Sequence, residues 1–474
     1  MDITFADKKF MVLGRLPTLT RREAWLRVQV LGGHVEDKLK KGADYFILGE
    51  RVSAKRMTAA RAFGVPFLTE REFLDAVDAA LAAPPTEPPI EADLDAAIAT
   101  LRGVFDGPPT RDAWWTVTEL LDACHPAQLQ DLCHYVAPHV AAWSAANRPA
   151  HAPLYEFPSS YYRLRYASSS DLADDPCVAT TSWVQQLSIG LASPKFELLT
   201  SLSLNEFNPD GDILTNLTRN PSLTRLRELE VGFKNDATPA FYEALRTSEN
   251  LPSLDTLSLH TMTLDHADAL CGEHTLDALR WVRLRHPEAY PERDEVHATY
   301  SRLFEARWWS GVEGLDMGLS RHFGGVFAHK GATHAYDALV ERAENLPALK
   351  HLVVSDDLGL EHLFGSALLG RLERLSIATA TEHALPLLRH LDENTNHGVR
   401  VLDLSRTNYR GVDTMENHRL LFGCLCEAKH LDRFDAIVLP KLEDRVEEPA
   451  ELGRLEAVAM DADVALLPSP LLEY

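Results

Sequence analysis

One spacing of apolar residues, apolar-x-x-apolar-x-apolar, recurs along this chain from about residue 196 to its end. The last two residues of each copy lie two apart, which places both on one face of a β-strand, and the first closes the preceding turn. The steps between the first copies are 27, 28 and 25 residues, and later steps range from 21 to 37. The copies begin at Leu199, Leu226, Leu254, Leu279, Val312, Leu349, Leu372 and Val399, and weaker ones begin at Phe434 and Leu455.

A strand and the helix that follows it form the repeating unit. Residues 239–245 and 336–342 have the apolar spacing of helices, and Pro239 suits a first helical position, where its missing N–H costs nothing. One such unit cannot bury its apolar face alone, so successive units must stack. The pattern therefore predicts a curved α/β solenoid whose strands line the concave face.

The spacing resembles that of the leucine-rich repeat family, whose repeats are about 20–29 residues long. Residues 399–408 are the clearest copy, and Asn408 falls close to the family's asparagine position. The resemblance implies that residues 181–474 form a degenerate leucine-rich repeat solenoid that binds a protein partner on its concave face.

Polar residues between and after the apolar strand positions should be exposed to solvent on that concave face. We expect partner contacts from Asn205, Glu230, His260, Arg283, Asp316 and Asp403, with Ser201, Ser203, Glu228, Ser258, Arg285 and Ser405 beside them.

The first 82 residues follow a different pattern, in which short apolar runs alternate with helical segments. The apolar runs predict strands at residues 9–13, 45–48 and 65–68. Two capping boxes and one serine mark helix starts, at Thr20-x-x-Glu23, Thr69-x-x-Glu72 and Ser53. This alternation predicts a small parallel sheet covered by helices.

The order and landmarks of residues 1–82 resemble the BRCT domains of bacterial NAD-dependent DNA ligases and of the large subunit of replication factor C. The most specific landmarks are Gly32-Gly33 after the first helix and the strand that runs from Asp44 to Gly49. The resemblance implies recognition of phosphate, either at a DNA 5′ end or on a phosphoprotein.

The resemblance also implies which residues would hold that phosphate. Gly14 and Arg21 match the family pattern, and Arg56, with Lys55 beside it, takes the place of a lysine. Leu13 replaces a hydroxyl residue, and Ala59 replaces a second lysine. Two interpretations stay open, a phosphate site or a degenerate domain that makes protein contacts.

Between these regions, residues 83–95 form a Pro-rich linker and residues 96–180 a helical and irregular capping region. Pro126 should start a helix there, and Pro138 should kink or end one. Cys124-His125 and Cys133-His134 are nine residues apart, which separates them around a helix, so we expect no zinc site and no other metal. Cys424 lies on an apolar stripe and is expected in the core.

The charge differs between the two ends of the chain. The net charge is -23, but residues 1–80 hold 14 Lys and Arg against 11 Asp and Glu. An acidic body disfavours DNA, so a DNA contact would be confined to the first domain. Six cysteines without framework spacing predict a reducing compartment. With no long apolar run, we expect a cytoplasmic protein, nuclear in a eukaryote, with no membrane contact.

Motifs for nucleotide-binding glycine loops, zinc hydrolases and serine nucleophile elbows are missing from the sequence. We therefore expect no enzyme and no cofactor. The domain types favour a non-enzymatic adaptor that joins a BRCT module to a leucine-rich repeat scaffold. The alternatives are a protein that binds DNA ends or nicks in repair or replication, and a phosphopeptide-binding adaptor.

Overall fold

The computed structural model describes most of the chain, with gaps. The described residues are 3–5, 8–19, 21–31, 33–36, 42–82, 94–107, 111–124, 126–146, 163–165, 187, 192–204, 211–231, 238–260, 262–272, 276–285, 293–317, 329–354, 360–364, 366–378, 381–394, 396–405, 414–440 and 450–467. By internal contacts the chain divides into two compact parts. One is mainly residues 1–141 and the other mainly residues 225–474.

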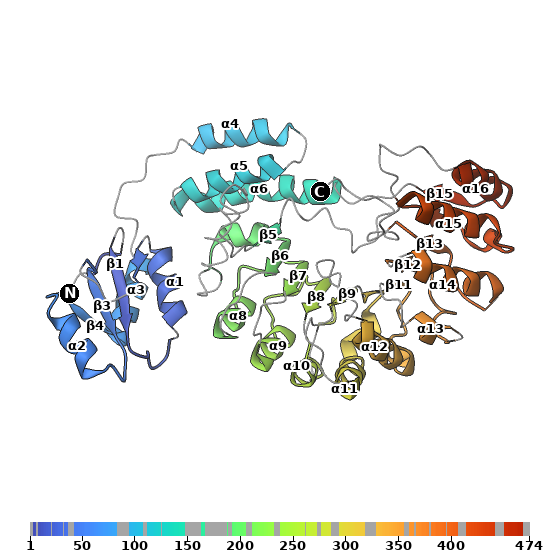
Figure 1. Cartoon of the computed structure of the whole chain (residues 1–474). Helices are drawn as coiled ribbons and strands as arrows, with labels where there is room; N and C mark the ends of the chain where they lie inside the picture. Colours follow the sequence, from blue (N-terminus) through green and yellow to red (C-terminus); the bar gives the residue numbers. More distant parts are fainter. Residues whose placement is uncertain are drawn as a thin grey trace. The chain divides into compact units, whose positions relative to one another are not determined.

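The N-terminal domain, residues 3–82, is built on a four-stranded sheet in the order β2-β1-β3-β4 (Figure 1). All three strand pairs are parallel. The strands are β1 (Lys9–Leu13), β2 (His34–Val35), β3 (Tyr45–Leu48) and β4 (Phe67–Thr69), and the helices are α1 (Arg21–Val30), α2 (Ala54–Arg61) and α3 (Glu70–Ala82). The predicted parallel sheet with covering helices is confirmed.

Alternate residues of the strands fill two separate apolar cores, one on each face of this sheet. Phe10 and Val12 of β1 pack with residues of α1 and α3, including Val28 and Phe73. On the other face, Met11 and Leu13 pack with Phe46 and with Ala60 of α2. Leu13, which the resemblance aligns with a hydroxyl residue, is thus fully buried.

Local signals placed the helices of this domain well. The Ser53 side chain caps α2 by accepting a hydrogen bond from Arg56 N at 3.4 Å. Glu72 and Thr69 form the expected reciprocal cap of α3. The strand predicted at 65–68 begins two residues later, at Phe67, and the short strand β2 was not predicted.

Three helices follow the N-terminal domain, α4 (Leu94–Phe105), α5 (Arg111–Ala123) and α6 (Pro126–Ala146). Pro126 starts α6 as predicted. Pro138 was expected to kink or end a helix, and it does not end one, because α6 continues through it to Ala146. Leu132, Val136 and Val140 are buried on both sides of Pro138, and this packing outweighs the loss of one backbone hydrogen bond.

The larger sheet has eleven strands within the described residues, and their order follows the chain from β5 to β15. Pairs from β6 to β15 are parallel. The strands are β5 (Arg163–Arg165), β6 (Ser201–Leu204), β7 (Glu228–Val231), β8 (Thr256–His260), β9 (Trp281–Arg285), β10 (Gly314–Asp316), β11 (His351–Val354), β12 (Arg374–Ile377), β13 (Val401–Asp403), β14 (Ala436–Val438) and β15 (Ala465–Leu467).

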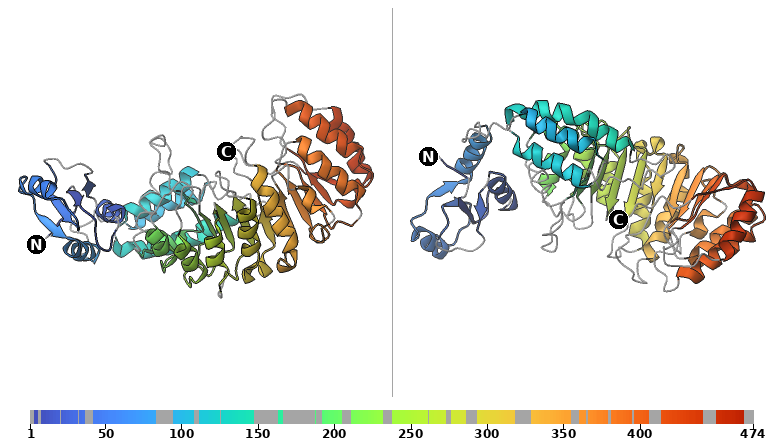
Figure 2. Two further views of the ribbon diagram at one scale, coloured as in Figure 1. Left: turned by 60° about the horizontal axis from the view of Figure 1, so that its bottom comes forward. Right: turned by 90° about the horizontal axis from the view of Figure 1, so that it is seen from above.

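Helices separate most of these strands and lie along one side of them (Figures 1 and 2). They are α8 (Gly211–Thr218), α9 (Pro239–Arg246), α10 (Leu264–Leu270), α11 (Arg293–Leu303), α12 (His329–Glu341), α13 (Leu360–Leu363), α14 (Thr381–Glu393), α15 (Thr414–Cys426) and α16 (Ala450–Asp461). Short 3₁₀ turns precede several strands, for example η5 (Arg307–Gly311), η6 (Ala343–Asn345) and η7 (Leu431–Arg433).

The period-two apolar residues of the repeated pattern form continuous ladders across the sheet. The strand register aligns Leu202, Leu229, Leu257, Val282, Leu315, Leu352, Leu375, Leu402 and Ile437 in one row. Every member of this row is at most 1% exposed, so the row forms the core of the C-terminal part.

The weak copy of the apolar pattern at Leu455, Val458 and Met460 predicts a strand, and this prediction is wrong. These residues lie in α16, where Met460 is 77% exposed, and the strand is β15. An i, i+3 spacing fits a helix as well as the turn before a strand, which explains the error. In α15, Cys426 is buried and Cys424 only half-buried, so Cys424 lies nearer the surface than expected.

Candidate functional site

The carboxyl edge of the small sheet offers the N-terminal domain a place for a ligand site. β1 and β3 are neighbours, but the chain leaves β1 through α1 toward β2 and leaves β3 through α2 toward β4. In open α/β sheets, ligands bind where the strand order switches in this way, beside the carboxyl ends of the strands. Gly14 directly follows β1 at this edge.

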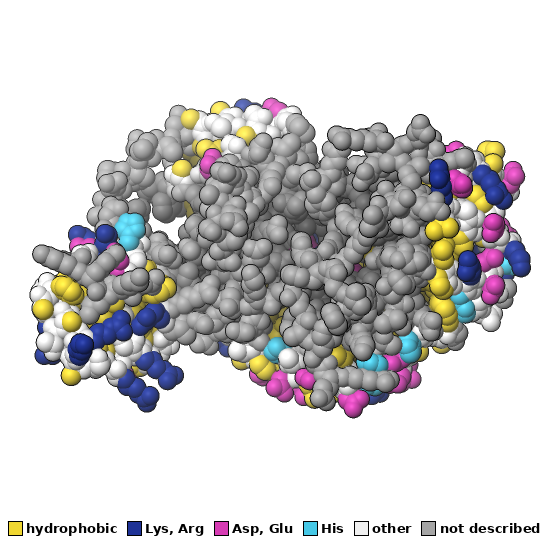
Figure 3. Space-filling view, viewed as in Figure 1, with side chains coloured by type: hydrophobic (Ala, Val, Ile, Leu, Met, Phe, Trp, Pro, Cys, Tyr) yellow, Lys and Arg dark blue, Asp and Glu magenta, His cyan; other side chains and the backbone are white. Residues whose placement is uncertain are grey.

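The predicted cationic residues lie in the first turns of the two helices that begin at this edge. Arg21 is the first residue of α1 and is exposed; in α2, Lys55 is exposed and Arg56 is half-buried. Because α1 and α2 pack on opposite faces of the sheet, the two groups approach the edge from opposite sides. Figure 3 shows Lys and Arg side chains gathered on this domain.

The backbone closes tightly over Gly14. Its φ is +86°, and an added Cβ would overlap the Glu50 carbonyl oxygen. Arg15 N donates to Glu50 O at 3.0 Å, and Glu50 N donates to Arg15 O at 2.6 Å. Glycine is therefore required here by its backbone conformation and by the close approach of Glu50. This requirement holds whether or not the edge binds an anion.

A buried carboxylate fixes the loop that enters α1. Glu70, at the start of α3 and 8% exposed, accepts hydrogen bonds from Thr18 N at 3.0 Å and Leu19 N at 2.7 Å. The Thr18 hydroxyl donates to the same carboxylate at 3.0 Å. These contacts tie the loop before Arg21 to the first residue of α3, about 50 residues later in the chain, and no local sequence pattern predicted them.

The larger sheet has a polar face, defined here by Glu228, Glu230, Arg283, Asp316, Arg374 and Asp403, the residues that alternate with the apolar ladders. We predicted that such residues would be exposed, and this prediction is wrong for seven of them, since Glu228, Ser258 and Ser405 are at most 3% exposed and four others are also buried. Their exposed fractions are 8% for Glu230, 9% for Arg283, 1% for Asp316 and 1% for Asp403. His260 ends β8 and Asn205 follows β6, but the His260 side chain and all of Asn205 lie outside the described residues.

The physical reason for this burial is the register of parallel strands, which places polar side chains of neighbouring strands next to one another. Arg283 Nη1 lies 3.3 Å from Glu228 Oε1, although one strand separates them. Arg374 Nη2 lies 2.7 Å from Asp403 Oδ2 on the adjacent strand. In each pair the two side chains contact each other, so their charged groups interact within the protein and are shielded from water.

Asp403 is the centre of the best-defined group on this face. Its carboxylate accepts hydrogen bonds from Ser376 Oγ at 3.0 Å and from Ser405 N at 3.0 Å, besides the Arg374 contact. Burial acts to raise the pKa of Asp403, but the Arg374 charge and the Ser405 hydrogen bonds outweigh it and hold the pKa below its usual value. Asp403 is thus a fixed negative charge.

An aromatic group lies between the two charged pairs. The Trp281 ring extends across Gly314 toward His351, whose ring centroid is 5.4 Å away. Burial, and then the Arg374 charge, lower the pKa of His351, so the imidazole is neutral at pH 7. Arg374, Trp281 and His351 were missed from the sequence, although all three occupy the position just before the ladder residue of their strands.

The described residues contain no group of three or more His, Cys, Asp or Glu placed to hold a metal ion. Burial raises the pKa of the Cys133 thiol to about 12.

Among the described helices, none is both long and apolar enough to cross a membrane.

Comparison with known proteins finds similarity to DNA ligases over about 70 residues of the N-terminal region. The chain is 34% identical over 77 residues to the DNA ligase of Dehalococcoides mccartyi strain BAV1, which is 16% of this chain and 11% of that ligase. It is 42% identical over 69 residues to DNA ligase 1 of Opitutus terrae, 15% and 10% of the two chains. It is 46% identical over 68 residues to the DNA ligase of Pseudothermotoga lettingae, 14% and 10%.

This chain therefore spans about a tenth of the length of the curated relatives it matches. No family model matches any part of it. The short parallel sheet and the ligase similarity together support a BRCT-like domain at the N-terminus.

Proposed function

We propose that this chain is a non-enzymatic adaptor in which a BRCT-like domain and a leucine-rich repeat scaffold, residues 181–474, hold separate partners. The observation that supports the scaffold is the apolar ladder, which runs in register through nine successive parallel strands. A stack of strand-and-helix units offers a long continuous surface, which suits protein binding more than the enclosure of a substrate.

The proposed partner surface is the polar face of the larger sheet. Its charged pairs are fixed by mutual contacts, so a partner would meet a preformed pattern and would lose little entropy in ordering it. His351 and Val401 are half-buried beside the Arg374–Asp403 pair, and we assign the contact to this part of the face.

Affinity capture with the full chain tests this assignment. Val401→Lys places a charge on the polar face without touching the apolar ladder, and Met460→Lys places the same charge on the exposed side of α16 as a control. We expect Val401→Lys to deplete the captured partners and Met460→Lys to retain them. Equal capture by both variants and by the unchanged chain would contradict the assignment.

A second candidate function is the binding of a 5′-phosphorylated DNA end by the BRCT-like domain. The similarity to DNA ligases favours it, together with the exposed Arg21 and Lys55 at the carboxyl edge of the sheet. The acidic residue Glu50, whose backbone closes on Gly14, opposes it. On this proposal the acidic remainder of the chain makes no DNA contact.

Titration of phosphorylated and unphosphorylated duplexes against the full chain distinguishes this candidate from a protein-contact domain. Preference for the 5′ phosphate should disappear in an Arg21→Ala/Arg56→Ala variant and persist in Arg61→Ala, at the far end of α2. The affinity should also fall steeply with salt. Equal affinity for both duplexes would rule the candidate out, and a parallel titration with a phosphopeptide tests the remaining alternative.

A further inference from the structure

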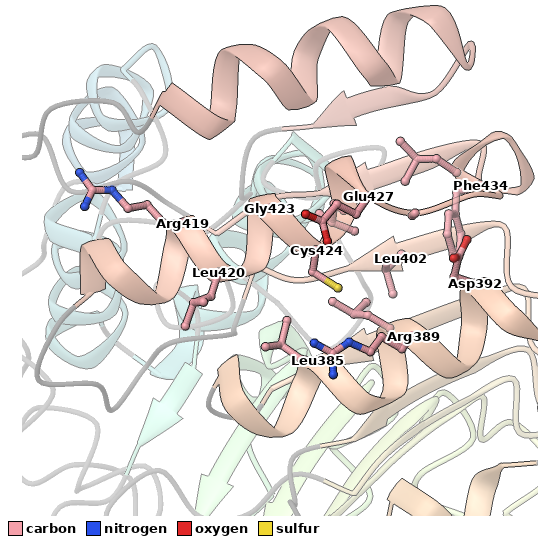
Figure 4. A pocket seen from close by; sticks show the side chains of 14 residues that line it. Leu385, Arg389, Asp392, Leu402, Arg419, Leu420, Gly423, Cys424, Glu427 and Phe434 are labelled. Carbon is pink, nitrogen blue, oxygen red and sulfur yellow. The ribbon is translucent and has the colours of Figure 1, made fainter.

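A cavity of about 360 Å³ lies between α14 and α15 in the C-terminal part of the chain (Figure 4). This volume is at the lower end of the range typical of small-molecule sites, about 300–1,000 Å³. The wall combines charged side chains with an apolar part that includes Leu385, Leu388, Leu420 and Phe434. It lies in the helical layer, away from the polar face on which the proposed partner binds.

Gly423 lines this cavity without placing a side chain in it. It lies inside α15, where glycine weakens a helix relative to alanine. A Cβ at this position would meet no atom within 4 Å, so no close backbone contact requires glycine here. The missing side chain instead leaves room between the two helices, beside Cys424.

Two basic and two acidic side chains line the cavity, Arg389 and Arg419 against Asp392 and Glu427. Asp392 lines it, but its Oδ1 already accepts a hydrogen bond from His430 N at 2.8 Å. Arg389 is exposed and points along the wall toward Cys424 (Figure 4). Burial raises the pKa of the Cys424 thiol, and Arg389 lowers it by less, so the thiol is neutral at pH 7 and does not cancel the Arg389 charge.

We propose that this cavity is a binding site for a small carboxylate with an apolar chain or ring. The apolar part packs against Leu388, Leu420 and Phe434 in the space opened by Gly423. The carboxylate accepts hydrogen bonds from the Arg389 guanidinium at the mouth, where a planar bidentate contact is available. Cys424 lies against the ligand and serves as a reporter of occupancy.

Calorimetric titration of the full chain with decanoate tests the chemical class, with decylamine and decanol as matched probes of the same chain length. We expect decanoate to bind and the other two to bind at least tenfold more weakly, because only the carboxylate pairs with Arg389. Bound decanoate should also slow alkylation of Cys424 by N-ethylmaleimide, measured by mass spectrometry.

Two pairs of variants localise the binding. Arg389→Gln should weaken decanoate binding about tenfold to a hundredfold, whereas Arg400→Gln, an exposed arginine outside the cavity, should not change it. Gly423→Leu should abolish binding by filling the cavity. Gly453→Leu, also at an open helical glycine, is its control, and Gly423→Met serves if the leucine variant does not fold.

The proposal is overturned if decanoate does not bind at millimolar concentration, or if decylamine binds as tightly. It is also overturned if binding survives both Arg389→Gln and the glycine variant that folds, since the ligand would then lie elsewhere. None of these outcomes depends on whether a protein partner binds the polar face.

Discussion

Asp403 shows how a charge can be kept inside this protein. At 1% exposure its ionised form depends on Arg374, Ser376 and the Ser405 amide. Burying an ion pair gives little net stability, but removing one partner leaves the other charge buried and unmatched. The pair therefore fixes the arrangement of β12 and β13 more than it strengthens the sheet.

Asp403→Asn should destabilise the protein by about 3–5 kcal/mol at pH 7, because the Arg374 charge loses its counterion. Since the folded pKa of Asp403 lies below the unfolded value, its contribution is complete above pH ~4 and is lost as the pH falls below that. Urea unfolding at pH 7, 5, 4 and 3 measures this. The difference in free energy of unfolding between the unchanged protein and Asp403→Asn should narrow only below pH ~4. A difference that stays constant with pH would contradict the assignment.

Gly314 is fixed by a neighbouring ring. Trp281 occupies the space that a Cβ at position 314 would need, so Gly314→Ala should cost about 1–3 kcal/mol through overpacking. In a Trp281→Leu background the same change should cost much less. A double-mutant cycle by urea unfolding measures this coupling. If the stability losses of Gly314→Ala and Trp281→Leu simply add, the Trp281 ring is not what requires glycine at position 314.

At the scale of an element, the loop before α1 depends on the start of α3. Glu70 and Glu72 both accept backbone hydrogen bonds, but Glu70 is buried and Glu72 is exposed. Glu70→Ala leaves the Thr18 and Leu19 amides without their acceptor and should cost about 1–3 kcal/mol.

Glu72→Ala is the matched control, and its effect should be smaller because water can replace the lost acceptor. Thermal unfolding followed by circular dichroism in the far ultraviolet compares the two variants. Equal losses of thermal stability in Glu70→Ala and Glu72→Ala would indicate that Glu70 acts only as an ordinary cap of α3.

Patterns within a few residues of sequence predicted most elements, since capping at Ser53 and Thr69 and the period-two ladders depend on local chemistry. Contacts between distant residues were not predictable in the same way. The Arg283–Glu228 pair joins residues 55 apart, and its burial follows from strand register. Likewise, the segment from Leu455 to Met460 could be assigned to a helix only by knowing that Leu455 is buried and Met460 is exposed.

At the scale of the whole molecule, each strand of the larger sheet pairs only with its neighbours in chain order. Stability in such an array is a sum of units and of nearest-neighbour interfaces. A local defect should therefore open the adjacent units first and leave distant ones protected.

Leu402→Ala removes one member of the apolar ladder and should cost about 2–5 kcal/mol. Hydrogen exchange should rise in β12, β13 and β14, with little change in β7, β8 and β9. An equal rise throughout the sheet would show that the strands unfold as one cooperative body instead.

The central claim is that the BRCT-like domain and the repeat scaffold hold different partners. The most direct measurement is quantitative affinity capture with three full-length proteins, the unchanged chain, Arg21→Ala/Arg56→Ala and Val401→Lys. We predict that each variant loses a different set of captured molecules and keeps the set that the other loses. Loss of the same set in both variants, or of nothing in either, would contradict the claim.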